Sequence, residues 1–363
     1  MKNLGSSDII LERLPAGIDI HVHFREPGFV HKETMKSGIE AAHAGGISAV
    51  VDMPNTNPTT DTLVELASKI KLANKYPGII IAGGLTDQSV KSSEITKIVS
   101  KTNILKVFLA ESTGNMVISE ENLIRGLELI KNDNYLIMFH AEKSDMIKNR
   151  TPTSKELEVR PIEAEVESIK YLISLAGDYP NLQFHITHVS CLTGAKLLYG
   201  QNNITWDVLA KYLCFSNDKV QEMGNYAKMN PPLRTLEDVT GLRKLLSEGK
   251  IPIVTSDHAP HTIAEKNDKL KIVAGAPGVQ ETYPFLIDLY LKNEISKQVM
   301  IDVIYNNPKK LLNKFGIKPL TGNITLNSGE QFHMTKKEIK SKCRWSLWEN
   351  KNFQGKITNI EFN

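Results

Sequence analysis

Two histidines separated by one residue, His21 and His23, follow an apolar run near the start of the chain. On a β-strand, side chains two positions apart point to the same face, so these two imidazoles can bind one metal ion. Arg25 lies two positions after His23, so it points to the same face and adds a fixed positive charge beyond the two rings. A single H-x-H pair predicts a metal site only weakly, because partly buried histidines are common. The question is whether other segments supply further ligands.

Further side chains capable of chemistry stand in or just after later apolar runs. Lys106 lies within such a run, where a charged amine is costly unless it is paired or chemically altered. His140 ends another run, and Asp257 follows the last one. His185 and His188 are three positions apart, so only one of them can face the same way, and His188 is the better candidate. Each residue alone has a structural explanation, but their joint position at strand ends is hard to explain by packing.

The types of these side chains predict a binuclear zinc site. Imidazole nitrogens and a carboxylate suit Zn²⁺ with an open position for water. The ligands divide into one set of His21, His23 and Asp257 and a second set of His140 and His188. Two cations in one site need an anionic bridge, which Lys106 can supply only as its carbamate, after carboxylation by CO₂. A hydroxide bridging the two ions would then attack a polarised carbonyl, so the pattern predicts amide hydrolysis.

Eight apolar runs alternate with amphipathic helical stretches between residues 18 and 256. The runs are 18–24, 48–53, 79–83, 104–109, 136–140, 183–189, 204–208 and 252–256. Continuous apolar strands that alternate with helices are typical of a parallel sheet covered by helices. Eight such units predict an α/β fold of the (β/α)8 TIM-barrel type, whose active site lies at the carboxyl ends of the strands. A doubly wound open sheet is the alternative, but its usual glycine-rich phosphate turn after the first strand is replaced here by His, His and Arg.

The pattern changes after the eighth run. Helical stretches continue over 280–292, 296–305 and 308–315, and three short runs at 323–326, 345–348 and 356–362 then predict strands of a small satellite sheet. We therefore expect a metal-dependent barrel over residues 14–316, with residues 1–13 and 317–363 forming a reduced β subdomain from the chain ends.

Composition excludes several classes of partner. The 44 Lys and Arg nearly balance the 41 Asp and Glu, which gives no electrostatic reason to expect nucleic acid or a membrane surface. The three cysteines lie far apart, so a reducing compartment fits better than a disulfide framework. No apolar run approaches the ~20 residues needed to span a bilayer, and the chain does not open with a signal-peptide pattern. We expect a cytoplasmic protein that acts on a small-molecule substrate.

Taken together, the motifs resemble those of the dihydroorotases, in the binuclear amidohydrolase superfamily. The resemblance rests on 19–28 (DIHVHFREPG), 31–33 (HKE), 53–56 (MPNT), 230–234 (NPPLR), 255–261 (TSDHAPH) and 276–278 (APG). It extends from about residue 14 to the end of the chain. It implies the reversible, zinc-dependent cyclisation of N-carbamoyl-L-aspartate to (S)-dihydroorotate in pyrimidine biosynthesis.

The resemblance also implies a role for each matching residue. It implies the metal ligands named above, with carboxylated Lys106 bridging two Zn²⁺ ions, and it makes Asp257 the general acid and base. It further implies a substrate site in which Arg25, Asn55 and His261 bind the carboxylate and Ala276 and Gly278 offer backbone groups to the ring edge. A fixed guanidinium beside the metals independently favours an anionic substrate.

Three features depart from the family pattern. Only twenty residues precede His21, so the satellite sheet must be reduced. The loop 109–114 offers Ser112 or Thr113 where the family carries a threonine-containing lid, and 209–212 (LAKY) replaces a Pro-His-His or Pro-His-Tyr segment. An allantoinase or hydantoinase with the same metals is one alternative, and an inactive homologue that acts as an assembly partner is another. The sequence leaves open a homodimer or a complex with another pyrimidine-pathway enzyme.

Overall fold

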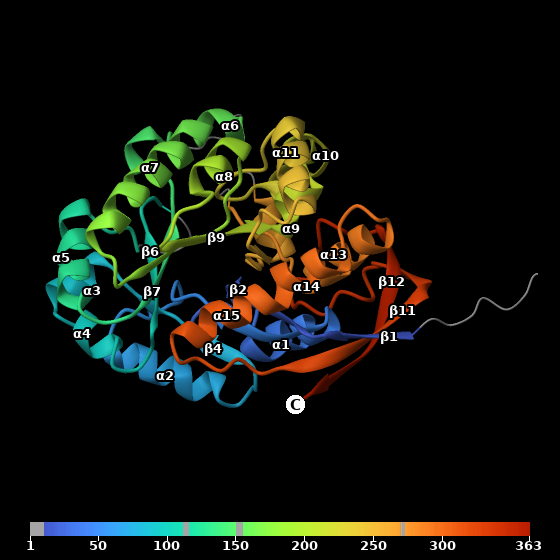
Figure 1. The fold of residues 1–363 in the computed structure, drawn as a ribbon, viewed down its shortest axis with the longest axis horizontal. Coiled ribbons are helices and arrows are strands. Elements are labelled where there is room, and N and C mark those ends of the chain that lie inside the picture. Colours follow the sequence, from blue (N-terminus) through green and yellow to red (C-terminus); the bar gives the residue numbers. More distant parts are fainter. Residues whose placement is uncertain (1–10, 112–115, 150–154, 269, 271–272) are drawn as a thin grey trace, which may run out of the picture.

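The computed structural model describes residues 11–111, 116–149, 155–268, 270 and 273–363. Parallel strands surround a common axis: β2 (Gly17–Val22), β3 (Ile47–Asp52), β4 (Ile79–Ile81), β5 (Gly83–Gly84), β6 (Ile104–Phe108), β7 (Leu136–His140), β8 (Gln183–Ile186), β9 (Ile204–Leu209) and β10 (Ile253–Thr255). β4 pairs with β3 and β5 pairs with β6, and only Ala82 separates them, so they are two halves of one barrel strand. Val22 pairs in parallel with His258, which closes the barrel. The (β/α)8 barrel predicted from the sequence is confirmed (Figure 1).

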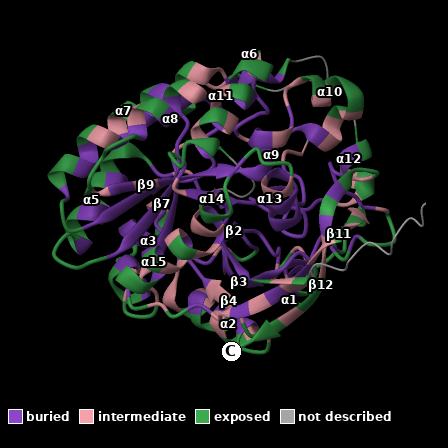
Figure 2. Cartoon of the chain, turned by 45° about the vertical axis from the view of Figure 1, so that its right-hand side comes forward, coloured by how far each residue is buried: buried purple, intermediate pink, exposed green. Residues whose placement is uncertain are grey.

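Helices cover the outside of the barrel, with their buried faces toward the strands and their exposed faces outward (Figure 2). The helices along the first half are α1 (Met35–Ala44), α2 (Leu63–Ala73), α3 (Asp87–Lys91), α4 (Ile95–Ile98), α5 (Glu120–Ile130), α6 (Glu156–Val159) and α7 (Ile162–Asp178). Those of the second half are α8 (Leu192–Leu198), α9 (Ala210–Cys214), α10 (Asp218–Met223), α11 (Leu236–Ser247), α12 (Ile263–Asn267), α13 (Thr282–Leu291), α14 (Lys297–Ile301) and α15 (Asn307–Lys314). Short 3₁₀-helices lie at Ser144–Met146 and Gly224–Ala227, and a π-helical turn lies at Asp302–Asn306.

Hydroxyl side chains begin many of these helices. Thr34, Thr62 and Ser119 each accept a hydrogen bond from the backbone N–H three residues on, which satisfies one of the free amides of the first turn. The helical stretch between β5 and β6 is broken into the two short helices α3 and α4. Ser93 between them has a left-handed φ of 57°, which a continuous helix does not allow.

A bulge in β2 decides which side chains reach the barrel mouth. Ile18 and Ile20 belong to the apolar cluster inside the barrel, whereas Val22 packs in the outer cluster with the helices. The pairing register of β2 with β3 shifts between Asp19 and Val22. Side chains that alternate between the inside and the outside of the barrel therefore change their order there. His21, the neighbour of Val22, is thereby directed to the inside of the barrel, above the apolar floor.

The chain ends build a separate antiparallel sheet beside the barrel, at the right of Figure 1. Its strands are β1 (Leu11–Pro15), β11 (Gly322–His333) and β12 (Asn352–Phe362), in the order β1-β11-β12. Leu14 and Pro15 pair with Ile324 and Asn323, so this sheet begins immediately before the first barrel strand.

The strand predicted over 345–348 is wrong. This segment consists of turns without regular pairing, although Trp345 and Trp348 are both buried. Its aromatic residues serve packing instead: the Trp348 ring meets Phe215 at 5.0 Å between centroids, and Trp345 contacts Tyr226 at 4.9 Å. Apolar character therefore marked burial here and did not distinguish a strand from a packed loop.

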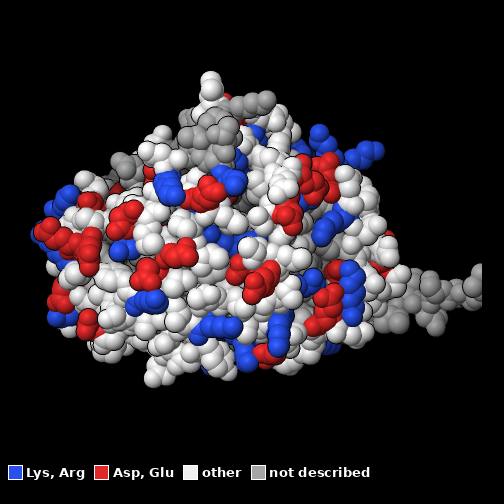
Figure 3. Space-filling view, turned by 90° about the horizontal axis from the view of Figure 1, so that it is seen from above, with Lys and Arg blue, Asp and Glu red and all other residues white. Residues whose placement is uncertain are grey.

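The surface agrees with the balanced composition. Figure 3 shows basic and acidic side chains interspersed over one face of the molecule. Within the described ranges, no helix is both long enough and apolar enough to cross a membrane.

Candidate active site

The ends of β2 and β10 bring His21, His23 and Asp257 together at the mouth of the barrel. Oδ1 of Asp257 lies 3.0 Å from Nε2 of His23 and 3.6 Å from Nε2 of His21. One ligand atom from each residue lies within 4.8 Å of the other two, and all three residues are buried. Two imidazoles and a carboxylate at this spacing can hold one Zn²⁺ ion.

His140 at the end of β7 and His188 beyond β8 lie beside this group. Nδ1 of His140 is 3.0 Å from Nε2 of His188, and the centroids of the His21 and His188 rings are 5.3 Å apart. Burial lowers the pKa of both His140 and His188, so both imidazoles are neutral at neutral pH. Neutral imidazole is the form that binds metal ions. The predicted second set of ligands therefore converges in space with the first.

Lys106 on β6 is fully buried at the same site. Its Nζ donates to Oγ1 of Thr187 over 2.8 Å, and the Thr187 hydroxyl donates in turn to the carbonyl of Phe139. Burial lowers the pKa of Lys106 to about 7, against the opposing influence of nearby carboxylates. A large fraction of this side chain is therefore the uncharged amine at neutral pH, which is the form that reacts with CO₂.

Several buried nitrogen atoms of this group are without a hydrogen-bond partner in the described part of the chain. They are both ring nitrogens of His21 and Nδ1 of His188. A buried polar atom left unpaired costs about 1–3 kcal/mol, so native structures rarely tolerate several together. A metal ion satisfies such atoms, and the donor set therefore fits the metal centre that the ligand types predict.

Three residues of the site have strained backbones. Arg25, His188 and Asp257 take left-handed φ values of 62°, 46° and 41°. Residues other than glycine rarely adopt this conformation, and it costs about 1–3 kcal/mol where it is imposed. Strain of this kind concentrates at functional sites because it aims a side chain in a direction that relaxed backbone does not offer.

A positively charged subsite adjoins the histidines. Nε of Arg25 donates to the carbonyl of Pro260 over 3.2 Å, while its buried Nη1 finds no partner in the described ranges. Burial lowers the pKa of Arg25 to about 10, so the guanidinium stays charged at neutral pH. Nε2 of His261 lies 3.3 Å from Nη2 of Arg25 and 2.9 Å from the carbonyl of Ala274. A buried guanidinium with an unused N–H is a donor for an anion.

Asn55, which follows β3, faces the metal-ligand group. Its Oδ1 lies 2.6 Å from Nδ1 of His23. The resemblance implies that this residue binds the substrate carboxylate, and the contact with His23 is one that neither the resemblance nor the sequence pattern indicated.

The segment 276–278 is tied to the barrel by Lys211, in the departure LAKY after β9. Nζ of Lys211 donates to the carbonyl of Ala276 over 2.8 Å and to that of Asp257 over 3.0 Å. The N–H of Gly278 donates to Nδ1 of His258. The carbonyl of Ala276 and the N–H of Gly278, in the two residues that the resemblance assigns to the substrate ring, thus have partners within the protein. The hydroxyl of Tyr212 donates to the carbonyl of Pro231 and so holds a neighbouring turn.

Other buried charges surround the site and were missed by reasoning from the sequence. Glu142 lies 2.9 Å from Nε2 of His140, and Arg160 binds Glu142 through Nε and Nη2. Both side chains are buried, and a buried charge is costly unless it is paired, so each of the two charges needs the other. The available signal was Glu142, two residues after the predicted ligand His140.

His185 does not belong to the group of candidate ligands. Its ring is held by Asp207 and Thr205, as expected for a side chain that faces the opposite way from His188. Ser112 and Thr113 lie outside the described residues.

The comparisons with known proteins agree with this geometry. The model of the Amidohydrolase family matches residues 13–276. A dihydroorotase of Methanosarcina acetivorans is 33% identical over 332 residues, covering 85% of this chain and 71% of its own. A dihydroorotase of Halobacterium salinarum is 31% identical over 352 residues, covering 93% and 82%. The solved structure of an L-hydantoinase (dihydropyrimidinase) from Arthrobacter aurescens aligns with a TM-score of 0.88 at 22% identity, over 96% of this chain and 84% of its own, which shows the shared fold. The chain belongs to the amidohydrolase family.

Proposed function

We propose that this protein is a dihydroorotase, which interconverts N-carbamoyl-L-aspartate and (S)-dihydroorotate. Family membership and the curated relatives support a metal-dependent hydrolase of cyclic amides. The observation that carries the choice of substrate is Arg25, a buried and charged guanidinium beside the histidine cluster with an N–H that no described residue accepts. Dihydroorotate carries a carboxylate on its ring, whereas hydantoin and allantoin do not.

In this proposal His21, His23 and Asp257 would hold one Zn²⁺ ion, His140 and His188 would hold a second, and carboxylated Lys106 would be a ligand that both ions share. When bound, the ions lower the pKa of water toward ~7 and polarise a carbonyl oxygen. The low pKa of Lys106 supports the carbamate, because only the uncharged amine adds to CO₂.

Asp257 is the proposed general acid and base. Burial alone would raise its pKa, but His21 and His23 outweigh burial and hold the pKa well below its usual range. The carboxylate is therefore ionised and able to accept the proton of the attacking water. During hydrolysis it passes this proton to the departing ring nitrogen, and during cyclisation the same proton moves in reverse.

The substrate end of the site is assigned to the loops after β2, β3 and β10. Arg25, Asn55 and His261 bind the carboxylate, and Ala276 and Gly278 border the ring. A hydrogen bond from Gly278 N–H to the ring would share or replace its present bond to His258. Burial lowers the pKa of His261 to about 3, so its ring binds the carboxylate as a neutral group and Arg25 supplies the charge.

The test is an assay of purified protein with dihydroorotate beside a hydantoin and allantoin. We expect turnover of dihydroorotate with a kcat/KM at least about a hundredfold above that for either uncharged ring, the discrimination expected for a lost charge-assisted contact. Preferred turnover of hydantoin would replace this proposal with the hydantoinase alternative. Binding of zinc without turnover of any of the three rings would favour an inactive assembly partner.

A further inference from the structure

Residues 338–345, called here the rim segment, lie against the mouth of the barrel without regular secondary structure. Alternate residues of the segment are buried, from Ile339 through Ser341 and Cys343 to Trp345. Burial raises the pKa of Cys343 to about 12, so its thiol stays protonated at neutral pH. A loop whose alternate side chains are all inserted into the protein is fixed in place and can fix its neighbours.

The rim segment contacts the loops that carry Arg25, His261 and the segment 276–278. Nζ of Lys342 donates to the carbonyl of Val30, in the loop that begins at Arg25. Nε1 of Trp345 donates to the carbonyl of His261 over 2.7 Å. The N–H of Lys340 donates to Oε1 of Gln280, just after the segment 276–278. One short stretch near the end of the chain thus joins loops that are more than 200 residues apart.

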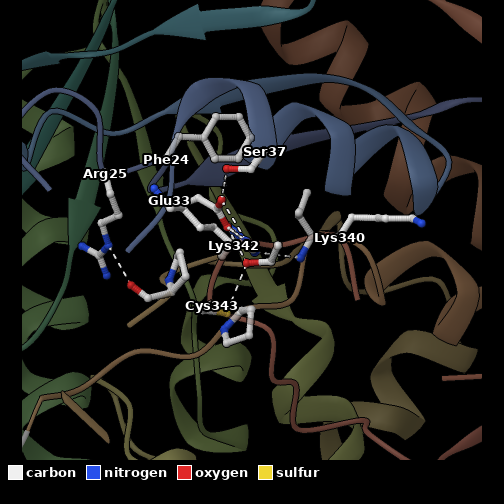
Figure 4. A network of polar contacts seen from close by, with 12 residues as sticks. Phe24, Arg25, Glu33, Ser37, Lys340, Lys342 and Cys343 are labelled. Carbon is white, nitrogen blue, oxygen red and sulfur yellow. Dashed lines mark hydrogen bonds and ion pairs between the residues drawn. The ribbon is translucent and has the colours of Figure 1, made fainter. Parts of the chain in front are cut away.

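Glu33 is the main contact between the rim segment and the site (Figure 4). Its side chain is fully buried, and the residues that surround the carboxylate are hydrogen-bond donors. The N–H of Lys342 donates to both of its oxygens at 3.1 and 3.2 Å, and the hydroxyls of Ser341 and Ser37 also donate. Nε2 of His258 lies 3.3 Å from Oε2, and the N–H of Thr34 donates to Oε1 over 3.4 Å.

The contacts of His258 define its tautomer. The N–H groups of Gly278 and Val279 lie 3.2 and 3.4 Å from Nδ1, and a backbone amide can only donate. Nδ1 is therefore the acceptor, so the neutral ring carries its hydrogen on Nε2 and donates it to Glu33. The backbone carbonyl of His258 also accepts the N–H of His23. The imidazole thus connects the rim segment to the loop that borders the substrate ring.

We propose that the rim segment is the element that positions the substrate subsite, with Glu33 and Trp345 as its positioning residues. Glu33 holds His258 in the Nε2–H tautomer, which in turn holds the amides of Gly278 and Val279. Trp345 holds the backbone of His261 beside Arg25. This inference rests on the proposed function for its substrate, whereas the tautomer of His258 does not depend on any activity.

Two tryptophans provide a matched test. Trp345→Phe removes the indole N–H that holds His261 and keeps an aromatic ring. Trp348→Phe makes the same change three residues on, where Nε1 has no partner in the described part of the chain. We expect Trp345→Phe to raise the KM for dihydroorotate about tenfold with kcat nearly unchanged, and Trp348→Phe to change KM less than about twofold. Equal effects of the two variants on KM would overturn the role of Trp345.

Glu33 is tested by Glu33→Ala and by the conservative Glu33→Gln, which keeps an acceptor for His258. The tautomer is read from ¹⁵N-histidine NMR spectra, in which the His258 signals are identified because they are lost in the variant His258→Gln. We expect the Nε2–H tautomer in the wild type and in Glu33→Gln. Glu33→Ala should show mixed tautomers and a raised KM. A wild-type tautomer that persists unchanged in Glu33→Ala would overturn the role of Glu33. Lack of wild-type turnover would refute the proposed function alone, because the spectra still decide the positioning role.

Discussion

The side-chain oxygen of Asn55 lies 2.6 Å from Nδ1 of His23. An amide oxygen only accepts, so Nδ1 of His23 carries the hydrogen and Nε2 presents a lone pair. Nε2 in turn lies 3.0 Å from Oδ1 of Asp257, an atom that also presents lone pairs. Two acceptors at this separation repel one another unless a proton or a metal ion lies between them. The contact therefore supports a metal ion at this point and gives Asn55 a role in orienting a ligand.

The first prediction separates two roles for Asn55. Asn55→Ala removes the acceptor that orients His23, so we expect zinc affinity to fall about 10- to 100-fold, as for other lost partners of ligating histidines. Asn55→Asp keeps an acceptor and should retain zinc, but its charge should raise the KM for the anionic substrate. Zinc competition with a chromogenic chelator measures the first effect and steady-state kinetics the second. Full zinc affinity in Asn55→Ala would contradict the orienting role.

The second prediction concerns the charge of Arg25. Arg25→Met keeps most of the side-chain length and removes the guanidinium, so kcat/KM for dihydroorotate should fall roughly 10- to 150-fold, the value of a charge-assisted hydrogen bond. The same variant should change kcat/KM for dihydrouracil, an analogue without the carboxylate, far less. Arg13→Met, at an exposed pair with Glu361, is the surface control. Equal losses on the two substrates would refute the carboxylate assignment.

The third prediction addresses the carbamate of Lys106. Lys106→Ala should abolish turnover, because it removes the bridging group while leaving the histidines in place. Short carboxylic acids such as acetate or propionate should restore part of the activity and of the second zinc equivalent, measured by metal analysis. His185→Gln changes a buried residue that is tied to Asp207, outside the proposed ligands, and serves as the control. Full activity in Lys106→Ala without added acid would eliminate the bridge.

The barrel and the convergence of its candidate ligands could be predicted from the sequence, because both follow from short-range patterns. Apolar runs at regular intervals indicate strands, and parallel barrel strands place their carboxyl ends at one mouth. His21 and Lys106 could therefore be assigned to one site without knowledge of their distance. The bulge in β2, which sets the direction of His21, depends on pairing with β3 and has no signal in the sequence.

The supporting contacts could not be predicted, because they join residues that are far apart in the chain. Glu33 meets Ser341 across 308 positions, and Trp345 meets His261 across 84. Lys211 is instructive, since it is buried beside an apolar run, and a lysine within such a run was the signal used for Lys106. Its partners are backbone carbonyls of 257 and 276, which no side-chain pattern reveals. Trp345 and Trp348 indicated burial correctly and a strand wrongly.

The fourth prediction concerns a fully buried ion pair beneath the site. Nζ of Lys69 lies 2.9 Å from Oδ2 of Asp52, whose Oδ1 accepts the N–H of Phe24 next to Arg25. Lys69→Met leaves the carboxylate unpaired, so the free energy of unfolding should fall by about 3–5 kcal/mol. The double variant Lys69→Met/Asp52→Asn removes both charges and should recover most of this loss. Urea unfolding measures both, and equal stability of the single and double variants would contradict the pairing.

The last prediction is a pH dependence that arises from Asp19. Burial raises its pKa from 3.8 to about 7, against hydrogen bonds from Ser256 and the N–H of His21. Between these two pH values the folded state binds more protons than the unfolded state, so its stability falls as pH rises, by up to about 1.4 kcal/mol per pH unit. Asp19→Asn cannot titrate. In metal-free protein, its stability relative to the wild type should therefore increase from pH 5 to pH 7 and stay constant above. Urea unfolding at each pH measures this difference, and a difference that does not vary with pH would show that Asp19 does not titrate in this range.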